Sequence, residues 1–291
     1  VDGSLSHFDS AAVWERADVD PRVTTGWLGR ALDQLVDEDP DPLLGLSVGG
    51  SSASMTAPGW TPFTLPADGV IPWSAEFRAA NPGLGRAFPE LATVTDEDPP
   101  LAAAVRRSQD VVLDVGGRIG RSSAPGDGAH GDAVADSALG RQLALVADLI
   151  GGDLPTRAFH LRHGGFDTHA DQLGAHRRLL VELDEAIAGF LARLGAGADR
   201  VVIMTWSEFG RRARFNGSGT DHGTAAPALV TGSRVIGGHH GAAPALDRLD
   251  RAGNLVVTTD FRDYLSGVVA GTLGVDPEPV APGRRPLELV R

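Results

Sequence analysis

The sequence of 291 residues contains no cysteine. This absence excludes a disulfide framework, a thiolate metal site and a cysteine nucleophile. Any bound metal ion would therefore need oxygen and nitrogen ligands. The redox compartment stays undecided.

Long apolar runs are also missing, because none approaches the roughly 20 residues that cross a bilayer. The first residues, VDGSLSHFDS, have neither the charged start nor the apolar centre of an export signal. We therefore expect a soluble chain without a membrane span. It begins at Val1 and not at Met, which fits a processed product, a non-ATG start codon or a fragment.

Basic residues are in deficit, and the net charge of -12 argues against nucleic acid or an anionic membrane surface as the main partner. The hydrophobic content of 42% is enough for one α/β domain or two smaller ones. We predict a single domain over residues 1–291. Its oligomeric state cannot be derived from composition.

The first half of the chain carries weak structural signals. Apolar spacing predicts a helix over 26–37 and helices over 101–115 and 137–150, and a short strand is expected at 43–48. Residues 49–100 are rich in Gly, Pro, Ser and Ala, which favours long surface loops. Residues 121–133, RSSAPGDGAHGDA, form the segment that we expect to be most mobile.

The second half is more regular and indicates βαβ organisation. The expected elements are strands at 156–162, 201–206, 227–231 and 255–258, and helices at about 169–195 and at 261–273. A strand, a long helix and a second strand normally make a right-handed parallel crossover. We therefore predict an α/β fold with a mostly parallel sheet between helices, in which ligands bind near the carboxyl ends of the strands.

The long helix at 169–195 carries one apolar stripe and one charged face. We expect the stripe to cover the sheet and the charged residues to face outward. The stripe consists of Leu173, Leu180, Leu183, Ile187, Phe190 and Leu194, and the outward face holds Arg177, Arg178, Glu182 and Glu185.

Two pairs of carboxylate and imidazole side chains flank the expected strands. Asp167 with His169 follows the strand at 156–162, and Asp221 with His222 lies in GTDHG. Carboxylate oxygens and neutral imidazole nitrogens are ligands of zinc and manganese, and neighbouring glycines let the backbone turn around an ion. The pairs together indicate a metal-assisted hydrolase.

Each pair also has a purely structural interpretation. Thr168 and Asp171 fit a capping box, in which case Asp167 would favour the positive end of the helix. Asp221, His222 and Gly223 also fit an ordinary turn.

Other polar residues in this half are candidates for the same site. His240, with His239 in GGHHG, is either a solvated side chain or a further metal ligand. Glu208 in SEFGRR can be a ligand, a carboxylate that supports a ligand or a charge at a helix start. Arg211 can bind an anionic substrate group or pair with Glu208.

Several motifs in this order and spacing resemble the bacterial family called domain of unknown function 1501. They are SHFDSAAVWERA, GWLGRAL, GGFDTHADQ, SEFGRR, GTDHG and TTDFRDYL. The family belongs to the alkaline-phosphatase-like superfamily, whose members share a mostly parallel sheet between helices and metal-supported hydrolysis or transfer of phosphate or sulfate esters. The resemblance therefore implies a metal-dependent hydrolase acting on a small anionic ester.

The resemblance also implies roles for individual residues. Asp167, His169, Asp221 and His222, with His240 as the late histidine, would hold one or two divalent ions such as zinc, manganese or calcium. Ser6, at a predicted helix start, would be the hydroxyl nucleophile, unless a metal-bound water attacks or Ser6 is only an N-cap with Ser4 as the alternative. Arg211 would bind the substrate anion.

Relatives usually begin with an export signal and a strand ending in an Arg-Gly-Gly-x-Asp segment, whose Asp resembles another metal ligand. The present sequence lacks both. If the chain is a full-length product, we expect it to lack both a central strand and one metal ligand. If it is a piece of a longer protein, we expect that protein to be exported. A chain without export would be cytoplasmic. The competing hypotheses are a degenerate member that binds a ligand without catalysis and a structural exported protein.

Overall fold

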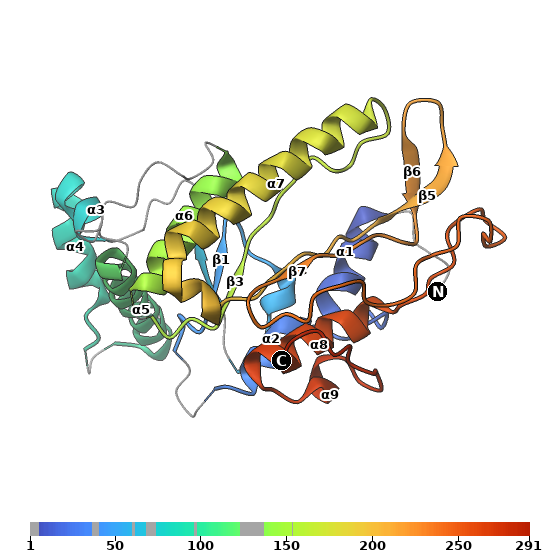
Figure 1. The fold of residues 1–291 in the computed structure, drawn as a ribbon. Coiled ribbons are helices and arrows are strands. Elements are labelled where there is room, and N and C mark those ends of the chain that lie inside the picture. Colours follow the sequence, from blue (N-terminus) through green and yellow to red (C-terminus); the bar gives the residue numbers. More distant parts are fainter. Residues whose placement is uncertain are drawn as a thin grey trace.

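The computed structural model describes residues 6–36, 41–59, 62–67, 74–95, 98–122, 137–152 and 154–291 of a mixed α/β protein (Figure 1). Within these ranges, no helix is both long and apolar enough to cross a membrane. The elements in chain order are α1 (His7–Arg16), α2 (Trp27–Asp33), β1 (Gly45–Val48), the 3-10 helix η1 (Ala53–Met55), β2 (Phe63–Leu65), α3 (Ala75–Ala80), α4 (Pro82–Ala92), α5 (Pro100–Ser122), α6 (Ala138–Gly151), β3 (Ala158–His160), α7 (Gln172–Leu194), the 3-10 helix η2 (Gly195–Arg200), β4 (Ile203–Met204), β5 (Gly210–Phe215), β6 (Thr220–Gly223), β7 (Val230–Thr231), α8 (Phe261–Leu273) and α9 (Pro277–Val280).

A three-stranded parallel sheet lies at the centre, in the order β2-β1-β3. Leu46 of β1 is opposite Phe63 of β2 and Phe159 of β3. All four residues of β1 are buried, as is usual for a parallel strand with both faces covered. The predicted strand at 43–48 is therefore confirmed, with a start two residues later.

The remaining strands are short and antiparallel. β4 pairs with β7, and β5 pairs with β6 to form a hairpin. The predicted crossover from 156–162 to 201–206 does not give a parallel pair, because β3 and β4 lie in separate sheets. The predicted strand at 255–258 is wrong, because Leu255 makes only an isolated bridge with Leu249.

Even so, β3 and the chain around β4 contribute side chains to both hydrophobic cores. Ala158 packs with one cluster and Phe159 with the other, and Val202 and Ile203 divide in the same way. This alternation follows from the two-residue period of extended chain. The strands therefore separate α2, α8 and α9 from α5, α6 and α7.

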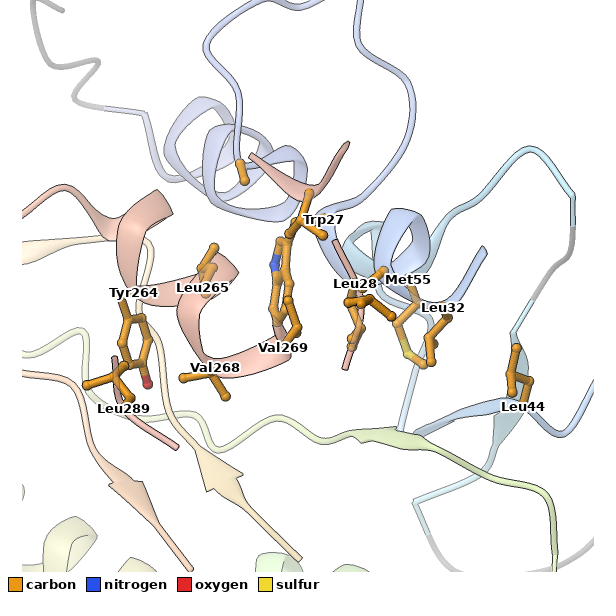
Figure 2. Close-up of a cluster of buried hydrophobic side chains, with 14 residues drawn as sticks. Trp27, Leu28, Leu32, Leu44, Met55, Tyr264, Leu265, Val268, Val269 and Leu289 are labelled. Carbon is orange, nitrogen blue, oxygen red and sulfur yellow. The ribbon is translucent and has the colours of Figure 1, made fainter. Parts of the chain in front are cut away.

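The first core brings together the N-terminal and C-terminal parts of the chain (Figure 2). Trp27 of α2 packs among apolar residues of α8, and the predicted helix 26–37 ends at Asp33. The helix predicted at 261–273 is confirmed with the same bounds. The most buried members of this first core include Ala31, Leu32, Met55, Leu265 and Val280.

The second core fills the opposite side of the sheet. The predicted helices 101–115 and 137–150 are confirmed as α5, which continues to Ser122, and α6. The buried side chains come from the sheet and from α5, α6 and α7, and include Leu43, Leu46, Leu65, Val115, Ile119, Leu149 and Phe190.

Residues 49–100 contain more regular structure than predicted. They include η1, β2, α3 and α4, so the expectation of loops throughout is wrong. Two local signals explain the helices: the Ser74 hydroxyl accepts a hydrogen bond from the Phe77 amide, and Pro82 occupies the first turn of α4, where its missing N–H costs nothing. Most of the segment 121–133 that we expected to be mobile lies outside the described residues.

The apolar stripe of α7 is only half covered. Phe190 is buried in the second core and Leu183 packs against it. Leu173 and Leu180, however, are 87% and 55% exposed. The first turns of α7 extend past the sheet towards the β5–β6 hairpin, so the predicted coverage of the sheet by the whole stripe is wrong (Figure 1).

A buried polar network lies where β1 and β3 end. Ser47 faces His160, with Oγ and Nδ1 3.4 Å apart. Burial lowers the pKa of His160 to about 4, and the charge of Arg162 acts in the same direction. Ser52, in the loop after β1, donates to the Glu15 carboxylate of α1 over 3.3 Å. The Ser52–Glu15 contact thus links α1 to the loop that follows β1.

The first prediction concerns the two leucine environments. Leu265→Ala removes a fully buried side chain and should lower the free energy of unfolding by about 2–5 kcal/mol, from lost burial and a residual cavity. Leu180→Ala, on the exposed part of α7, should change it by less than about 0.5 kcal/mol. Urea denaturation measures both, and equal costs would contradict the assigned cores.

The second prediction concerns His160. Between its folded pKa of about 4 and the ordinary value of 6.5, the unfolded chain binds more protons, so stability falls as pH falls through this window. The imidazole should account for about 2 kcal/mol of lost stability between pH 7 and pH 5. His160→Asn should remove that loss in urea titrations at both pH values. The exposed His239→Asn control should retain it.

Candidate metal centre

The segment that carries Asp167 is fastened from two sides. The Phe166 ring contacts the rings of His163 and His176 edge-on, at centroid distances of 5.3 and 5.7 Å. Arg211 of β5 donates from its guanidinium to the Phe166 carbonyl over 2.6 Å. These contacts hold Phe166, the residue before Asp167, through both its ring and its carbonyl.

Thr168 does not cap the following helix. α7 begins at Gln172, after Asp171 in a left-handed conformation that makes no side-chain cap. The Thr168 hydroxyl instead contacts His176 Nε2 at 2.9 Å. The capping-box interpretation is therefore wrong, because the chain turns at Asp171 before the helix starts.

Asp221 and His222 lie in strand β6 and not in a turn. His222 is opposite Arg211 across the hairpin. Gly223 permits this close pairing, since a Cβ there would lie 2.6 Å from the Arg211 backbone. The turn interpretation of this motif is wrong.

His7, the first residue of α1, is a member of the site that the sequence prediction missed. Its Nε2 lies 3.4 Å from Asp167 Oδ2, and its Nδ1 lies 3.1 Å from Glu208 Oε1. The available signal was its position directly after Ser6 in a motif already assigned to the site. Glu208 follows β4 and precedes a strand, so its interpretation as a charge at a helix start is wrong.

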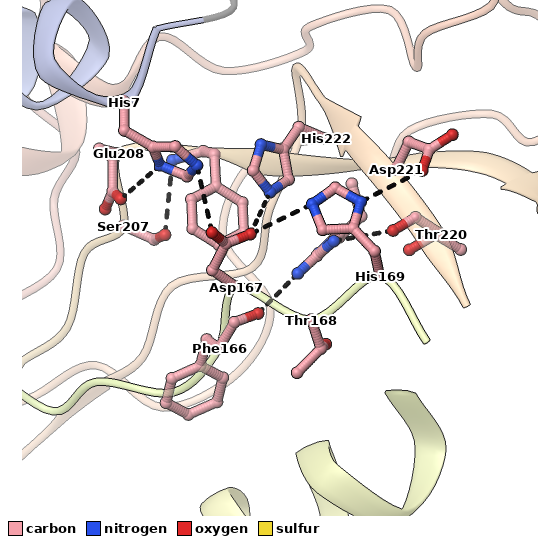
Figure 3. A network of polar contacts seen from close by, with 12 residues as sticks. His7, Phe166, Asp167, Thr168, His169, Ser207, Glu208, Thr220, Asp221 and His222 are labelled. Carbon is pink, nitrogen blue, oxygen red and sulfur yellow. Dashed lines mark hydrogen bonds and ion pairs between the residues drawn. The ribbon is translucent and has the colours of Figure 1, made fainter. Parts of the chain in front are cut away.

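Asp167 is the centre of the cluster (Figure 3). Its Oδ1 lies 2.7 Å from His222 Nε2 and 3.2 Å from His169 Nε2, while Oδ2 faces His7. The Asp167 side chain is 52% exposed and that of His222 is 22% exposed. The site is therefore open to small solutes.

The charges around the cluster favour ionised carboxylates. Burial alone would raise the pKa of Asp167, but the hydrogen bond with His222 and the nearby imidazoles hold it below the ordinary value. Hydrogen bonds from Asn216 and His169 lower the pKa of Asp221. Both side chains therefore present negative oxygens at neutral pH.

The predicted site residues are distributed as follows. Asp167, His169, Asp221 and His222 meet in space, with His169 Nδ1 3.3 Å from Asp221 Oδ1. His240 contacts the Ile236 carbonyl through Nε2 at 2.7 Å and does not belong to the metal-competent group found among the described residues.

The other two predicted residues surround the cluster. Ser6 caps α1, with its Oγ 3.4 Å from the Asp9 amide, and Ser4 lies outside the described residues. Arg211 donates to the carbonyls of Phe166 and Thr220, not to Glu208. Its role towards an anionic substrate stays a prediction, as does the role of Ser6 as nucleophile.

The donor set fits a divalent ion. One ligand atom each from His7, Asp167 and His222 lies within 4.8 Å of the other two. Two imidazole nitrogens and a carboxylate oxygen are the combination found at zinc and other transition-metal sites with open positions. The cluster could hold such an ion without a large rearrangement.

The fold and this cluster define a mixed α/β protein with a candidate metal centre. A family model described as "Protein of unknown function (DUF1501)" matches residues 119–266, just over half of the chain, and the chain belongs to this family. The comparison with curated proteins found no match, and neither did the comparison with solved structures. The matched region includes Asp167, Asp221 and His222 but not His7.

The third prediction tests how Arg211 holds the site. Lysine cannot reproduce two hydrogen bonds from a planar guanidinium. Arg211→Lys should lower the free energy of unfolding by about 1–3 kcal/mol, because a partly buried carbonyl loses a charged donor. Arg214→Lys, on the exposed part of the same strand, should have almost no effect. Equal urea midpoints for the two variants would show that Arg211 does not fasten the loop.

Proposed function

We propose that this protein is a metal-dependent hydrolase of phosphate or sulfate esters with an alkaline-phosphatase-like architecture. The observation that carries the proposal is the half-exposed Asp167 carboxylate in contact with His7, His169 and His222. Histidines that only stabilise the fold need no access to solvent. A metal ion that binds a substrate does need it.

The arrangement of the strands supports the architectural part of the proposal. Alternate side chains of the strands pack into two cores, and helices cover each core. A sheet between two layers of helices requires this arrangement. The site follows β3, beyond its carboxyl end, where ligands of parallel sheets bind.

The charges of the neighbouring residues suit an anionic ester. A bound ion would polarise an oxygen of the phosphoryl or sulfuryl group. Arg211 adds positive charge close enough to interact with Asp167 and Asp221. Burial lowers the pKa of Arg211 and the two carboxylates raise it. Because the ordinary pKa of a guanidinium is far above 7, the side chain stays cationic at neutral pH.

The chemical step is the addition of water across the ester bond. The nucleophile is either a water molecule or the Ser6 hydroxyl, which precedes His7 at the start of α1. The bond from phosphorus or sulfur to the ester oxygen breaks, and the leaving alcohol takes a proton. If Ser6 attacks first, water then releases the acid from the serine.

The fourth prediction is that aryl phosphate or sulfate esters are hydrolysed in the presence of zinc, manganese, magnesium or calcium. Asp167→Asn should lower kcat/KM at least about 100-fold, since it removes the charge that all three histidines contact. Asp110→Asn, on the exposed surface of α5, is the matched control and should keep full activity.

Chelator followed by metal addition should abolish and then restore turnover. Metal binding without turnover across the whole ester panel would instead favour a degenerate member that binds a ligand in the same site. Turnover that is insensitive to both chelator and Asp167→Asn would place the chemistry elsewhere.

A further inference from the structure

Two histidines of the site each lie between two carboxylates. His7 contacts Asp167 through Nε2 and Glu208 through Nδ1, at 3.4 and 3.1 Å. His169 repeats the pattern, with Asp167 at 3.2 Å from Nε2 and Asp221 at 3.3 Å from Nδ1 (Figure 3).

This pattern is the one that ligating histidines show, in which the metal takes the lone pair of one ring nitrogen and the other ring nitrogen donates its N–H to a carboxylate. A neutral imidazole carries one N–H, and a carboxylate at Nδ1 accepts it. When Nδ1 carries that proton, the lone pair of Nε2 points at an ionised oxygen of Asp167, and the two acceptors repel each other. Positive charge between them removes the repulsion, and a divalent ion supplies it for both histidines at once.

We propose that Glu208 and Asp221 are positioning carboxylates, which hold His7 and His169 with Nε2 towards an ion on Asp167. The inference rests on the metal site of the proposed function and assigns the ligand atoms: Nε2 of His7, His169 and His222, and the carboxylate of Asp167. It removes Asp221 from the ligands, although the family resemblance pairs it with His222.

The position of Glu208 supports this division. It reaches His7 at the ring nitrogen that does not face Asp167, so His7 separates it from the centre of the cluster. The next residue, Phe209, stacks on His222 at a centroid distance of 4.3 Å and meets His7 edge-on at 5.3 Å. One short segment therefore orients two of the ligand rings.

Asp221 is committed to other donors. Its Oδ1 accepts a hydrogen bond from Asn216 Nδ2 over 3.0 Å and also contacts His169. Among the residues that the structure describes, the metal-competent group consists of His7, Asp167 and His222, and the proposal adds His169 to it because its Nε2 lies 3.2 Å from Asp167 Oδ1.

The test is a measurement of zinc and cobalt affinity by competition with a chelating dye. Glu208→Gln and Asp221→Asn should keep one equivalent of bound metal and weaken its affinity by about 10–100-fold, the range for supporting partners of ligating histidines. Asp167→Asn and His222→Ala should lose stoichiometric binding. Glu182→Gln, which alters a carboxylate near His163 away from the site, is the matched control and should leave affinity unchanged.

A second readout separates positioning from general stability. In the metal-loaded protein, nitrogen NMR should report His7 and His169 as Nδ1–H tautomers, and Glu208→Gln should shift the His7 signal alone. Glu208→Ala should weaken metal binding more than Glu208→Gln, because the amide oxygen of Gln can still accept the Nδ1 proton. Urea titration of each variant checks that it is folded.

Three results would overturn the inference: Asp221→Asn losing metal as completely as Asp167→Asn, Glu208→Ala binding as tightly as the unmodified protein, or no metal binding at all. Absence of ester turnover in a metal-loaded protein with the expected affinities would count only against the hydrolase proposal. The two ideas can therefore fail separately.

Discussion

The rest of the site depends on the contacts between the negatively charged Asp167 carboxylate and three histidines. They bring together α1, the segment after β3 and the β5–β6 hairpin, three parts of the chain that are distant in sequence. Apolar packing alone gives no reason for polar side chains of these parts to converge. Three imidazoles around one ionised carboxylate instead bring together nitrogen and oxygen atoms that can bind a cation.

Each part is anchored away from the site, which lets the charged groups stay in place. In α1, the Trp14 ring packs against Trp206 and Phe261 at centroid distances of 5.9 and 4.2 Å, while Glu15 contacts the loop after β1. On the opposite side, Arg211 joins the hairpin to the Asp167 segment. Ligand side chains supported in this way lose little freedom when an ion binds, and this pre-organisation raises affinity.

Local patterns predicted those parts of the structure that local interactions decide. Helix α8 matches its predicted bounds because Asp260 caps its start and Gly274, in a left-handed conformation, ends it. The sequence indicated both Asp/His pairs as candidate ligands, but their meeting is a long-range contact between the segment after β3 and strand β6, which no local pattern specifies. The periodicity of α7 likewise indicates a helix but not which turns are covered, and the exposure of Leu173 depends on where the sheet ends.

His7 was missed although it directly follows Ser6 in a motif assigned to the site. A histidine at the first position of a short helix has no local signature of ligation, and its role comes from Asp167 and Glu208, which are far along the chain. The pairing of β3 and β4 failed similarly, because strand and helix signals do not specify which edges meet. Long-range contacts, and not weak propensities, limited both predictions.

Two histidines near the end of β3 show how environment assigns a role. His160, on the strand itself, is buried beside Ser47, and burial holds its pKa at about 4, so it stays neutral and serves packing. His169, beyond the strand, lies among ionised carboxylates and is open to solvent. A ligand site needs a negative potential and a route for the ion, and at the carboxyl edge of the small sheet Ser47 and His160 are buried. The candidate chemistry therefore lies one loop further out, where Asp167 meets the hairpin and α1.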